Sequence, residues 1–448
     1  MMQITDRHFR AMARTLSRKC ALYTEMVNAN AVRLSRDDVL AWEPAREGYV
    51  VCQLGGNEPK AMAEAAAIAR ARGYREVNIN CGCPSDRVEK GCFGASLMFQ
   101  PDLVAAMVRA CVAAVDDAIP ITVKCRLGAL QKNDPERVNF DFDRDYPPLL
   151  DFVRTVTDAG CSHVILHTRK AVLGGLSTDA NRRVPRLCRE AAWKLATDLP
   201  HVAVTANGEF RSLEECEAAL AAQPDGQRSI AGVMVGRAAC SHPWALLGGA
   251  DDSPILRCYC DDREEHVVRS ASAANGLEAP PGQPRPPPPA ALASTTVYAM
   301  TRRAAIAACA SHCARELACE YDLKHRNWVV PTPSEQQRMC TVLLKPLLHL
   351  LHGRGSKKVK AGMWTSVETW CKEQTARLGA EALAEPDSVV RALRKHEDLP
   401  RERIAAARVG LPLFPVEDVL SHLVAAHLTD EWLDAEAGRV DALCDVQD

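Results

Sequence analysis

The sequence predicts an α/β fold of the (β/α)8 TIM-barrel type, followed by an all-helical C-terminal domain. Between residues 20 and 248, short runs rich in β-branched residues alternate with Ala-rich stretches of helical periodicity. Strands that alternate with helices in this way form βαβ units and a parallel sheet. Glycine, amide and basic residues follow several of these runs. They would lie at the C-terminal ends of the strands, where a barrel of this type carries its chemistry.

Seven strands and five intervening helices are expected in this region. The strands are predicted over Ala21–Val27, Tyr49–Leu54, Glu76–Cys81, Ile121–Arg126, His163–His167, Val202–Ala206 and Gly232–Val235. The helices between them are predicted over Pro59–Arg72, Asp102–Val115, Tyr146–Ala159, Arg186–Asp198 and Leu213–Ala221. A closed barrel of this type has eight strands. The first would precede a helix predicted over Asp6–Leu16, where the chain has no room for it, so we expect a barrel without strand one; the alternative is an open seven-stranded sheet.

Composition restricts the class of protein. The chain has 448 residues, of which 47% are hydrophobic and 25% charged, the balance of a globular protein. No apolar run approaches the roughly 20 residues of a membrane span, and residues 1–20 lack the apolar core of a signal peptide. We therefore expect an intracellular protein, in the cytoplasm or an organelle, with most of its 19 cysteines reduced. Any transit peptide would lie upstream of Met1.

The rest of the chain divides into three parts. Residues 251–294 include a proline-rich run that reads as a linker or a disordered insertion after the barrel of residues 1–250. Residues 295–380 have helical periodicity. Within this segment, residues 341–372 contain six basic side chains and one acidic side chain, Glu368. Residues 381–448 are again helical and end acidic, with no role that the sequence indicates. The net charge of −2 excludes little, because the distribution of charge decides nucleic-acid binding.

The most specific motif follows the strand predicted over Glu76–Cys81. It reads Asn80-Cys81-Gly82-Cys83-Pro84-Ser85-Asp86-Arg87-Val88 and continues as Gly91-Cys92-Phe93-Gly94-Ala95-Ser96-Leu97. This loop resembles the active-site loop of the tRNA-dihydrouridine synthases. The resemblance implies that Cys83 donates a proton when a uracil ring in transfer RNA is reduced.

Further motifs of the same family lie in order at the ends of other predicted strands. They are Gln53-Leu54-Gly55-Gly56, Thr122-Val123-Lys124-Cys125-Arg126-Leu127-Gly128, His167-Thr168-Arg169-Lys170-Ala171, Asn207-Gly208 and Gly236-Arg237. The resemblance covers residues 1–250, more weakly 295–375, and is closest to the branch called type A, through Tyr23-Thr24-Glu25-Met26-Val27. Residues 1–10 resemble the end of the first family motif, so we expect the N-terminus to be truncated.

No side chain supplies hydride, so the reduction needs a cofactor. The resemblance implies that this cofactor is FMN and that NADPH is its reductant. Implied cofactor-binding residues are Met1, Gln53, Asn80, Lys124, His167, Asn207, Gly208, Gly236 and Arg237. Glycines and Arg237 suit a phosphate, and Lys124 suits an anionic reduced flavin. Glu209 departs from the family, which often has glycine there, and this puts close approach of the phosphate in doubt.

The resemblance also implies contacts with transfer RNA. Arg87, Arg126, Arg169 and Lys170 would face the RNA, and Arg354, Lys357 and Lys358 would form a basic clamp on the helical domain. Extruding a base from folded RNA costs a few kcal/mol, which phosphate contacts can offset. We expect a monomer that acts on D-loop uridines of the U20/U20a type.

Other interpretations remain open at this level. Cys81 and Cys92 compete with Cys83 as reactive thiols, and the three together lack the spacing of a zinc site, so no metal is expected. A different FMN barrel oxidoreductase acting on a small pyrimidine is one alternative. A non-catalytic tRNA-binding protein is another, because the barrel would lack its first strand.

Overall fold

The computed structural model describes residues 4–18, 20–35, 39–40, 42, 47–85, 88, 91–132, 134–241, 243 and 246–247. The expectations for Met1, Arg87, the linker and everything from residue 251 onward, including Arg354, Lys357 and Lys358, lie outside these residues. The chain divides into two compact units. One of them contains residues 17–239 and therefore all the strands, and the description below concerns that unit.

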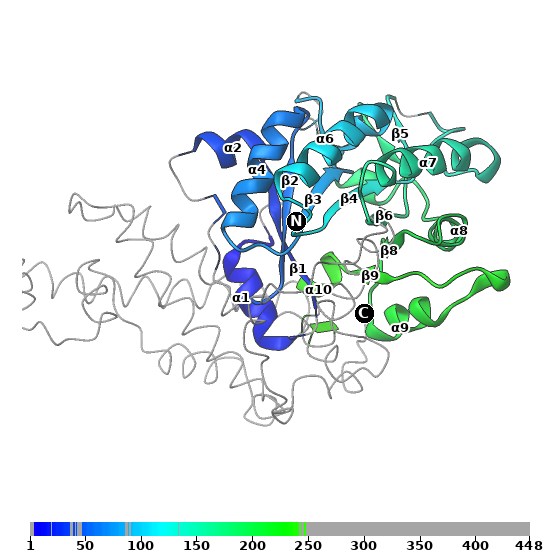
Figure 1. Ribbon diagram of the computed structural model, residues 1–448. Coiled ribbons are helices and arrows are strands. Elements are labelled where there is room, and N and C mark those ends of the chain that lie inside the picture. The colour runs from blue at the N-terminus through cyan, green and yellow to red at the C-terminus, as the bar shows by residue number, and fades with distance from the viewer. Residues whose placement is uncertain are drawn as a thin grey trace, which may run out of the picture. The chain divides into compact units, whose positions relative to one another are not determined.

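A parallel sheet of seven strands forms the centre of this unit (Figure 1). In chain order the strands are β1 (Leu22–Asn28), β2 (Val50–Gly55), β3 (Val77–Cys81), β4 (Ile121–Arg126), β6 (His163–His167), β8 (Ala203–Asn207) and β9 (Gly232–Met234). Each strand pairs with the next in parallel, so the spatial order follows the chain. All seven predicted strands are confirmed, and the α/β fold with a curled parallel sheet is consistent with a TIM barrel.

Helices connect the strands and lie around the outside of the sheet (Figure 1). They are α2 (Ala29–Leu34), α4 (Pro59–Ala71), α6 (Pro101–Ala114), α7 (Phe142–Thr157), α8 (Glu190–Asp198) and α9 (Leu213–Ala221), with α1 (Arg7–Leu16) before the sheet and α10 (Arg237–Ser241) after it. The five predicted connecting helices and the first helix are confirmed, whereas α2 and α10 were not predicted.

Local sequence explains where the helices begin. Pro59 and Pro101 occupy the first turns of α4 and α6, where the missing N–H has no intrahelical partner to lose. Ser212 caps α9 by accepting a hydrogen bond from the backbone N–H of Glu215. Asp141 caps α7 in the same way, and so α7 begins four residues before its predicted start at Tyr146.

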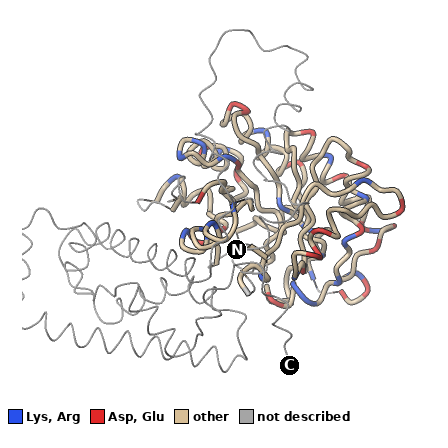
Figure 2. Tube along the Cα trace, turned by 90° about the horizontal axis from the view of Figure 1, so that it is seen from below, with Lys and Arg blue, Asp and Glu red and all other residues tan. Residues whose placement is uncertain are grey.

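The strands present apolar side chains to the helices and polar ones to the other face. In β3, Val77, Ile79 and Cys81 alternate with Asn78 and Asn80, and all five are buried. Alternating side chains of a strand point to opposite faces, so Asn78 and Asn80 share one face of the sheet. Charged residues of both signs are interspersed along the described part of the chain (Figure 2).

Short elements were not predicted. A two-stranded parallel sheet joins β5 (Ala129–Leu130) to β7 (Ala171–Val172), and 3-10 helices η1 (Gly94–Phe99), η2 (Ala180–Arg182) and η3 (Pro224–Gly226) lie in the connecting segments. The β5–β7 pair holds together the segments that follow β4 and β6. It therefore positions residues at the C-terminal ends of those strands.

Candidate active site

The sheet brings the predicted site residues together at the C-terminal ends of its strands. Asn80 pairs in register with Lys124, and His167 pairs with both Arg126 and Asn207. Neighbouring strands of a sheet lie about 5 Å apart. These side chains therefore belong to one site rather than to separate loops.

A chain of hydrogen-bonded, buried polar side chains connects the site to strands β2, β3 and β4. The Asn80 side-chain N–H2 donates to Oε1 of Gln53 (2.9 Å), and that of Gln53 donates to Oδ1 of Asn78 (2.8 Å). Asn78 donates in turn to Oγ1 of Thr122 (2.9 Å), whose hydroxyl donates to Glu76 (2.7 Å). Sequence analysis missed Asn78, Thr122 and Glu76 as site residues. Their signal is a polar residue at every second position of an otherwise apolar strand.

Asn80 also fixes the cysteine loop. Its Oδ1 accepts hydrogen bonds from the backbone N–H of Gly82 (3.1 Å) and of Cys83 (3.0 Å). The Cys83 thiol is partly exposed and lies 3.5 Å from Oγ of Ser85. Gly94 closes the loop at a φ of 68°, and a Cβ there would lie 2.7 Å from the carbonyl oxygen of Cys83. Only glycine fits at position 94. The position of Cys83 is therefore fixed by its hydrogen bond to Asn80 and by its close contact with Gly94.

The neighbouring cysteines are in different environments. Cys81 and Cys125 face each other across β3 and β4 and are fully buried. Burial raises the pKa of Cys125 to about 12 and that of Cys81 well above its ordinary value, so both stay protonated. Cys92 is exposed. Of these four thiols, Cys83 is the partly exposed one held at the polar end of the sheet.

Two basic side chains, Lys124 and His167, lie near the C-terminal ends of the neighbouring strands β4 and β6. Burial, followed by the charge of Arg126, lowers the pKa of Lys124 to about 8. Within the described residues, Nζ of Lys124 has no hydrogen-bond or ion-pair partner. Burial and the charges of Arg126 and Lys124 lower the pKa of His167 well below its ordinary value, so its imidazole is neutral at pH 7. The site thus offers an ammonium group and a neutral ring to a ligand.

Arg126 spans this site but uses its guanidinium within the protein. Its Nε donates to the carbonyl of Gly82 (2.9 Å), and its Nη1 donates to those of Lys170 (3.0 Å) and Asn181 (3.1 Å). The side chain is buried, and burial lowers its pKa to about 10. Arg126 therefore ties the cysteine loop to the segments after β6.

The other two described residues expected to face RNA are also buried. Lys170 Nζ donates to Asp145 (2.9 Å) and to the carbonyl of Arg137 (2.9 Å), and its side chain is 3% exposed. Arg169 is 5% exposed, hydrogen-bonds the carbonyl of Pro185 and forms an ion pair with Glu209 at 2.8 Å. In this structure both side chains make contacts within the protein, and RNA contact by either stays a prediction.

A glycine-containing edge lies at the far end of the sheet. Asn207 donates to the carbonyl of Met234 (2.8 Å), which joins the ends of β8 and β9. Gly208 has a φ of 139°, and a Cβ there would lie 2.7 Å from Leu187. Among the described residues, a Cβ on Gly236 would meet nothing within 4 Å. The Arg237 side chain is half exposed.

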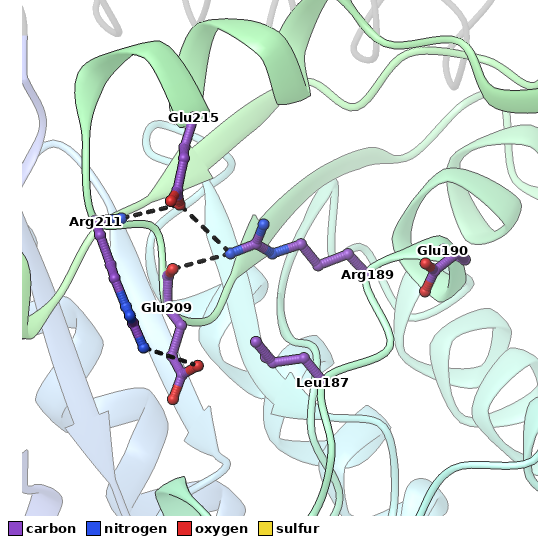
Figure 3. Close-up of a pocket in the computed structure, with 6 residues that line it drawn as sticks. All are labelled: Leu187, Arg189, Glu190, Glu209, Arg211 and Glu215. Atoms are coloured by element: carbon purple, nitrogen blue, oxygen red, sulfur yellow. Dashed lines mark hydrogen bonds and ion pairs between the residues drawn. The ribbon is translucent and has the colours of Figure 1, made fainter.

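A polar pocket of about 340 Å³ adjoins this edge (Figure 3). It is lined by Leu187, Arg189, Glu190, Glu209, Arg211 and Glu215. Arg189 donates to the backbone carbonyls of Gly208 (3.1 Å) and Glu209 (2.9 Å). None of these arginine contacts was foreseen from the sequence, where Arg189 and Arg211 lie in ordinary charged stretches.

The described residues contain neither a metal-binding cluster nor a membrane-spanning helix. No group of three or more His, Cys, Asp or Glu side chains is arranged there to hold a metal ion. No helix in that part of the chain combines the length and apolar character needed to cross a bilayer.

Comparison with known proteins identifies the family of this chain. A tRNA-dihydrouridine(20/20a) synthase of Vibrio cholerae is 42% identical over 247 residues, which are 55% of this chain and 69% of that protein. One of Shigella flexneri is 43% identical over 271 residues, 60% of this chain and 74% of that protein. Among solved structures, histamine dehydrogenase from Rhizobium sp. 4-9 aligns with 11% identity and a TM-score of 0.36 over 58% of this chain and 43% of that one, a likeness too low to support any conclusion. The family model for dihydrouridine synthase matches residues 1–253, and the chain belongs to the dihydrouridine synthase family.

Proposed function

We propose that this protein is a tRNA-dihydrouridine synthase that reduces uridines of the D-loop of transfer RNA, at positions 20 and 20a. Its membership of the dihydrouridine synthase family and the names of its relatives support the reaction and the positions. The position of Cys83 supports it independently. A partly exposed thiol is held by Asn80 at the C-terminal ends of parallel strands, and Lys124 lies on the neighbouring strand in register with Asn80.

The fold that we propose is a TIM barrel, of which the seven described strands are consecutive members. All seven run parallel, and their order in space is their order in the chain. That succession is the one a (β/α)8 barrel requires.

The cofactor that we propose is FMN, with NADPH as its reductant. A bound flavin would supply the hydride that no side chain can supply. The residues present fit such a group. Lys124 offers an ammonium group without a partner among the described residues, and His167 offers a neutral ring. Gly236 has no described neighbour within 4 Å of a Cβ position and precedes the cation of Arg237. Asn207 and Gly208 complete that edge, which suits a phosphate.

The side-chain amides of Gln53 and Asn80 are already hydrogen-bonded within the protein, which determines how they would contact a bound flavin. Each already has a partner for at least one polar atom, because Asn80 donates to Gln53 and Gln53 donates to Asn78. The amide oxygens have partners as well, because Oδ1 of Asn80 accepts from the backbone N–H of Gly82 and Cys83, and Oε1 of Gln53 accepts from Asn80. Their orientation is therefore fixed before any ligand binds. A preorganised amide loses little freedom on binding, so we assign both to positioning the ring edge.

Cys83 would hold the transferred proton on Sγ and deliver it to C5 of the uracil. General acid catalysis of this kind contributes about 10²- to 10⁴-fold to a rate. The role needs a protonated thiol with access to the ligand. Cys81 and Cys125 are protonated but fully buried, whereas Cys83 is partly exposed.

Transfer RNA is the proposed macromolecular partner, and the reaction is placed inside the cell, in the cytoplasm or an organelle. Arg354, Lys357 and Lys358 of the helical segment are proposed to contact its phosphates. We also propose that the chain acts as a monomer, which light scattering of the purified protein tests.

The reaction is tested with the full chain, FMN, NADPH and unmodified transfer RNA, by nucleoside mass spectrometry of the product. Cys83→Ala is expected to lower dihydrouridine formation about 10²-fold or more while leaving bound flavin unchanged. Cys92→Ala is the matched control, because Cys92 lies on the same loop but is exposed. Equal rates for Cys83→Ala and the wild type would refute the proton-donor role. Absence of dihydrouridine with flavin-loaded wild type would refute the proposed function.

A further inference from the structure

The carboxylate of Glu209 lies among three arginines. Its Oε1 is 2.8 Å from Nη2 of Arg169 and 3.7 Å from Nη2 of Arg237, and its Oε2 is 3.7 Å from Nη2 of Arg211. The pairing with Arg211 is visible at the edge of the pocket in Figure 3. These three side chains come from three separate segments of the chain, so the fold gathers them at one carboxylate.

This arginine cluster, Arg169, Arg211 and Arg237, has more positive charge than Glu209 neutralises. Three guanidinium groups face one carboxylate, and Glu215 accepts from the backbone N–H of Arg211 rather than from its guanidinium. Arg169 is 5% exposed, and its buried Nε has no hydrogen-bond partner among the described residues. A buried donor without a partner is costly, and an anion that accepts from it would remove that cost. The cluster therefore has capacity for a further anion.

The backbone of Glu209 is held in an unusual conformation. Its φ is 50°, in the left-handed region that glycine adopts freely and other residues rarely do. Arg189 maintains it by donating to the carbonyls of Gly208 and Glu209 and by stacking over Phe210 at 4.1 Å. Glu209 therefore has a side chain at a backbone position that suits glycine, and this side chain pairs with the buried Arg169. Both features indicate a specific role for Glu209 that an ordinary surface acid does not have.

We propose that the Glu209 carboxylate is an internal counter-ion that occupies the arginine cluster in place of a phosphate group, and that a phosphorylated ligand must displace it. The proposal rests on the proposed function, which supplies the phosphate as that of FMN. A phosphate dianion brings more charge and more acceptor oxygens than a carboxylate, so it satisfies the cluster better. Glu209 thereby weakens binding of the phosphorylated flavin and leaves binding of the ring alone unchanged.

The test compares FMN with riboflavin, which lacks the phosphate. Flavin-free full chain is titrated with each ligand, and binding is read from the quenching of flavin fluorescence. Glu209→Gln is expected to bind FMN roughly tenfold more tightly than the wild type, the size of one charge-assisted contact. Riboflavin affinity is expected to stay the same. Glu190→Gln is the matched control, because Glu190 lines the same pocket but forms no ion pair with the arginine cluster among the described residues.

A second variant separates charge from backbone strain and guards against misfolding. Glu209→Gly removes the carboxylate and suits the positive φ, so it is expected to give the same gain for FMN as Glu209→Gln. Unchanged or weaker FMN binding by both variants, with each folded by circular dichroism, would overturn the proposal. A gain that appears equally for riboflavin would also overturn it, because the phosphate would then not be involved.

Inorganic phosphate tests the counter-ion without any flavin. Phosphate at constant ionic strength is expected to raise the melting temperature of Glu209→Gln more than that of the wild type, and an equal rise would contradict the proposal. If neither flavin binds to any variant, the proposed function fails, and the phosphate comparison then decides the counter-ion by itself. If FMN binds the wild type and neither Glu209 variant gains affinity, the counter-ion fails alone.

Discussion

Replacing Lys170 with methionine distinguishes a structural lysine from one that reads RNA. The side chain is 3% exposed, and Nζ donates to Asp145 and to the carbonyl of Arg137, each at 2.9 Å. Methionine keeps most of the volume and removes the charge and both hydrogen bonds. We expect this change to destabilise the fold rather than to weaken RNA binding directly.

The expected loss of stability depends on the hydrogen bonds that Asp145 retains when Lys170 is replaced. Removing one partner of a buried ion pair costs about 3–5 kcal/mol, because the other charge is left without compensation. Asp145 is 10% exposed and still accepts from Nη2 of Arg144 (2.8 Å) and from its Nε (3.1 Å). Part of the loss is therefore offset. We expect Lys170→Met to lower the free energy of unfolding by about 2–3 kcal/mol.

The assay is urea denaturation of the full chain. Lys194→Met is the matched control, because Lys194 is 40% exposed and pairs with Asp198 one turn along α8 at 3.1 Å. An exposed pair of that kind contributes about 0.3–0.5 kcal/mol, so the control is expected to change little. The two variants remove the same charge from a buried pair and from an exposed pair.

The pH dependence has a definite sign. Burial by itself raises the pKa of Asp145, but hydrogen bonds from Arg144 and Lys170 outweigh it, and the folded pKa lies below the ordinary value. A lowered carboxyl pKa stabilises the fold above the unfolded pKa of about 3.9, and this stabilisation is lost as the pH falls through the folded pKa. The difference between the wild type and Lys170→Met should therefore be complete at pH 7 and shrink below about pH 4.

One result would refute this reasoning about Lys170. It is a change in unfolding free energy below about 0.5 kcal/mol, the size of a surface substitution. A simultaneous fall of about one unit in the salt dependence of tRNA binding would identify Lys170 as a phosphate contact instead.

Two further predictions concern charge. Lys124→Met is expected to raise the unfolding free energy of the flavin-free protein by about 1–2 kcal/mol at pH 7, because a pKa lowered to about 8 means that the fold disfavours this ammonium. FMN affinity should fall in the same variant, and a loss of stability on calorimetry would contradict the assignment. Lys357→Glu/Lys358→Glu is expected to weaken tRNA binding and flatten its salt dependence with flavin content unchanged. Identical binding across a salt titration would show that these lysines do not contact RNA.

The strands were predictable because each is a short apolar run that ends in glycine, proline or a polar residue. Ile121–Arg126 and His163–His167 have the predicted bounds. Local capping signals likewise fix α9, which begins after Ser212. The β5 and β7 pair could not be foreseen, because two-residue strands have no periodicity and pair across about 40 residues of sequence.

Side-chain partners were the other limit of the sequence. Arg169 and Lys170 form a basic dipeptide after a strand, which resembles a phosphate-binding pair. Their partners Glu209 and Asp145 are 40 and 25 residues away, and only the folded chain brings them together. The same holds for Arg126, whose contact with Gly82 spans 44 residues. Burial of a charge depends on such distant partners, so local sequence does not reveal it.

The most direct measurement is the visible absorbance spectrum of the purified full chain with FMN, recorded before and after NADPH and then after unmodified transfer RNA. The account predicts a protein-bound flavin spectrum that NADPH bleaches and that transfer RNA restores in the absence of oxygen, with dihydrouridine formed in step. A spectrum of free FMN only, or a bleached flavin that transfer RNA leaves reduced, would contradict a flavin-dependent reduction of tRNA uridines by this protein.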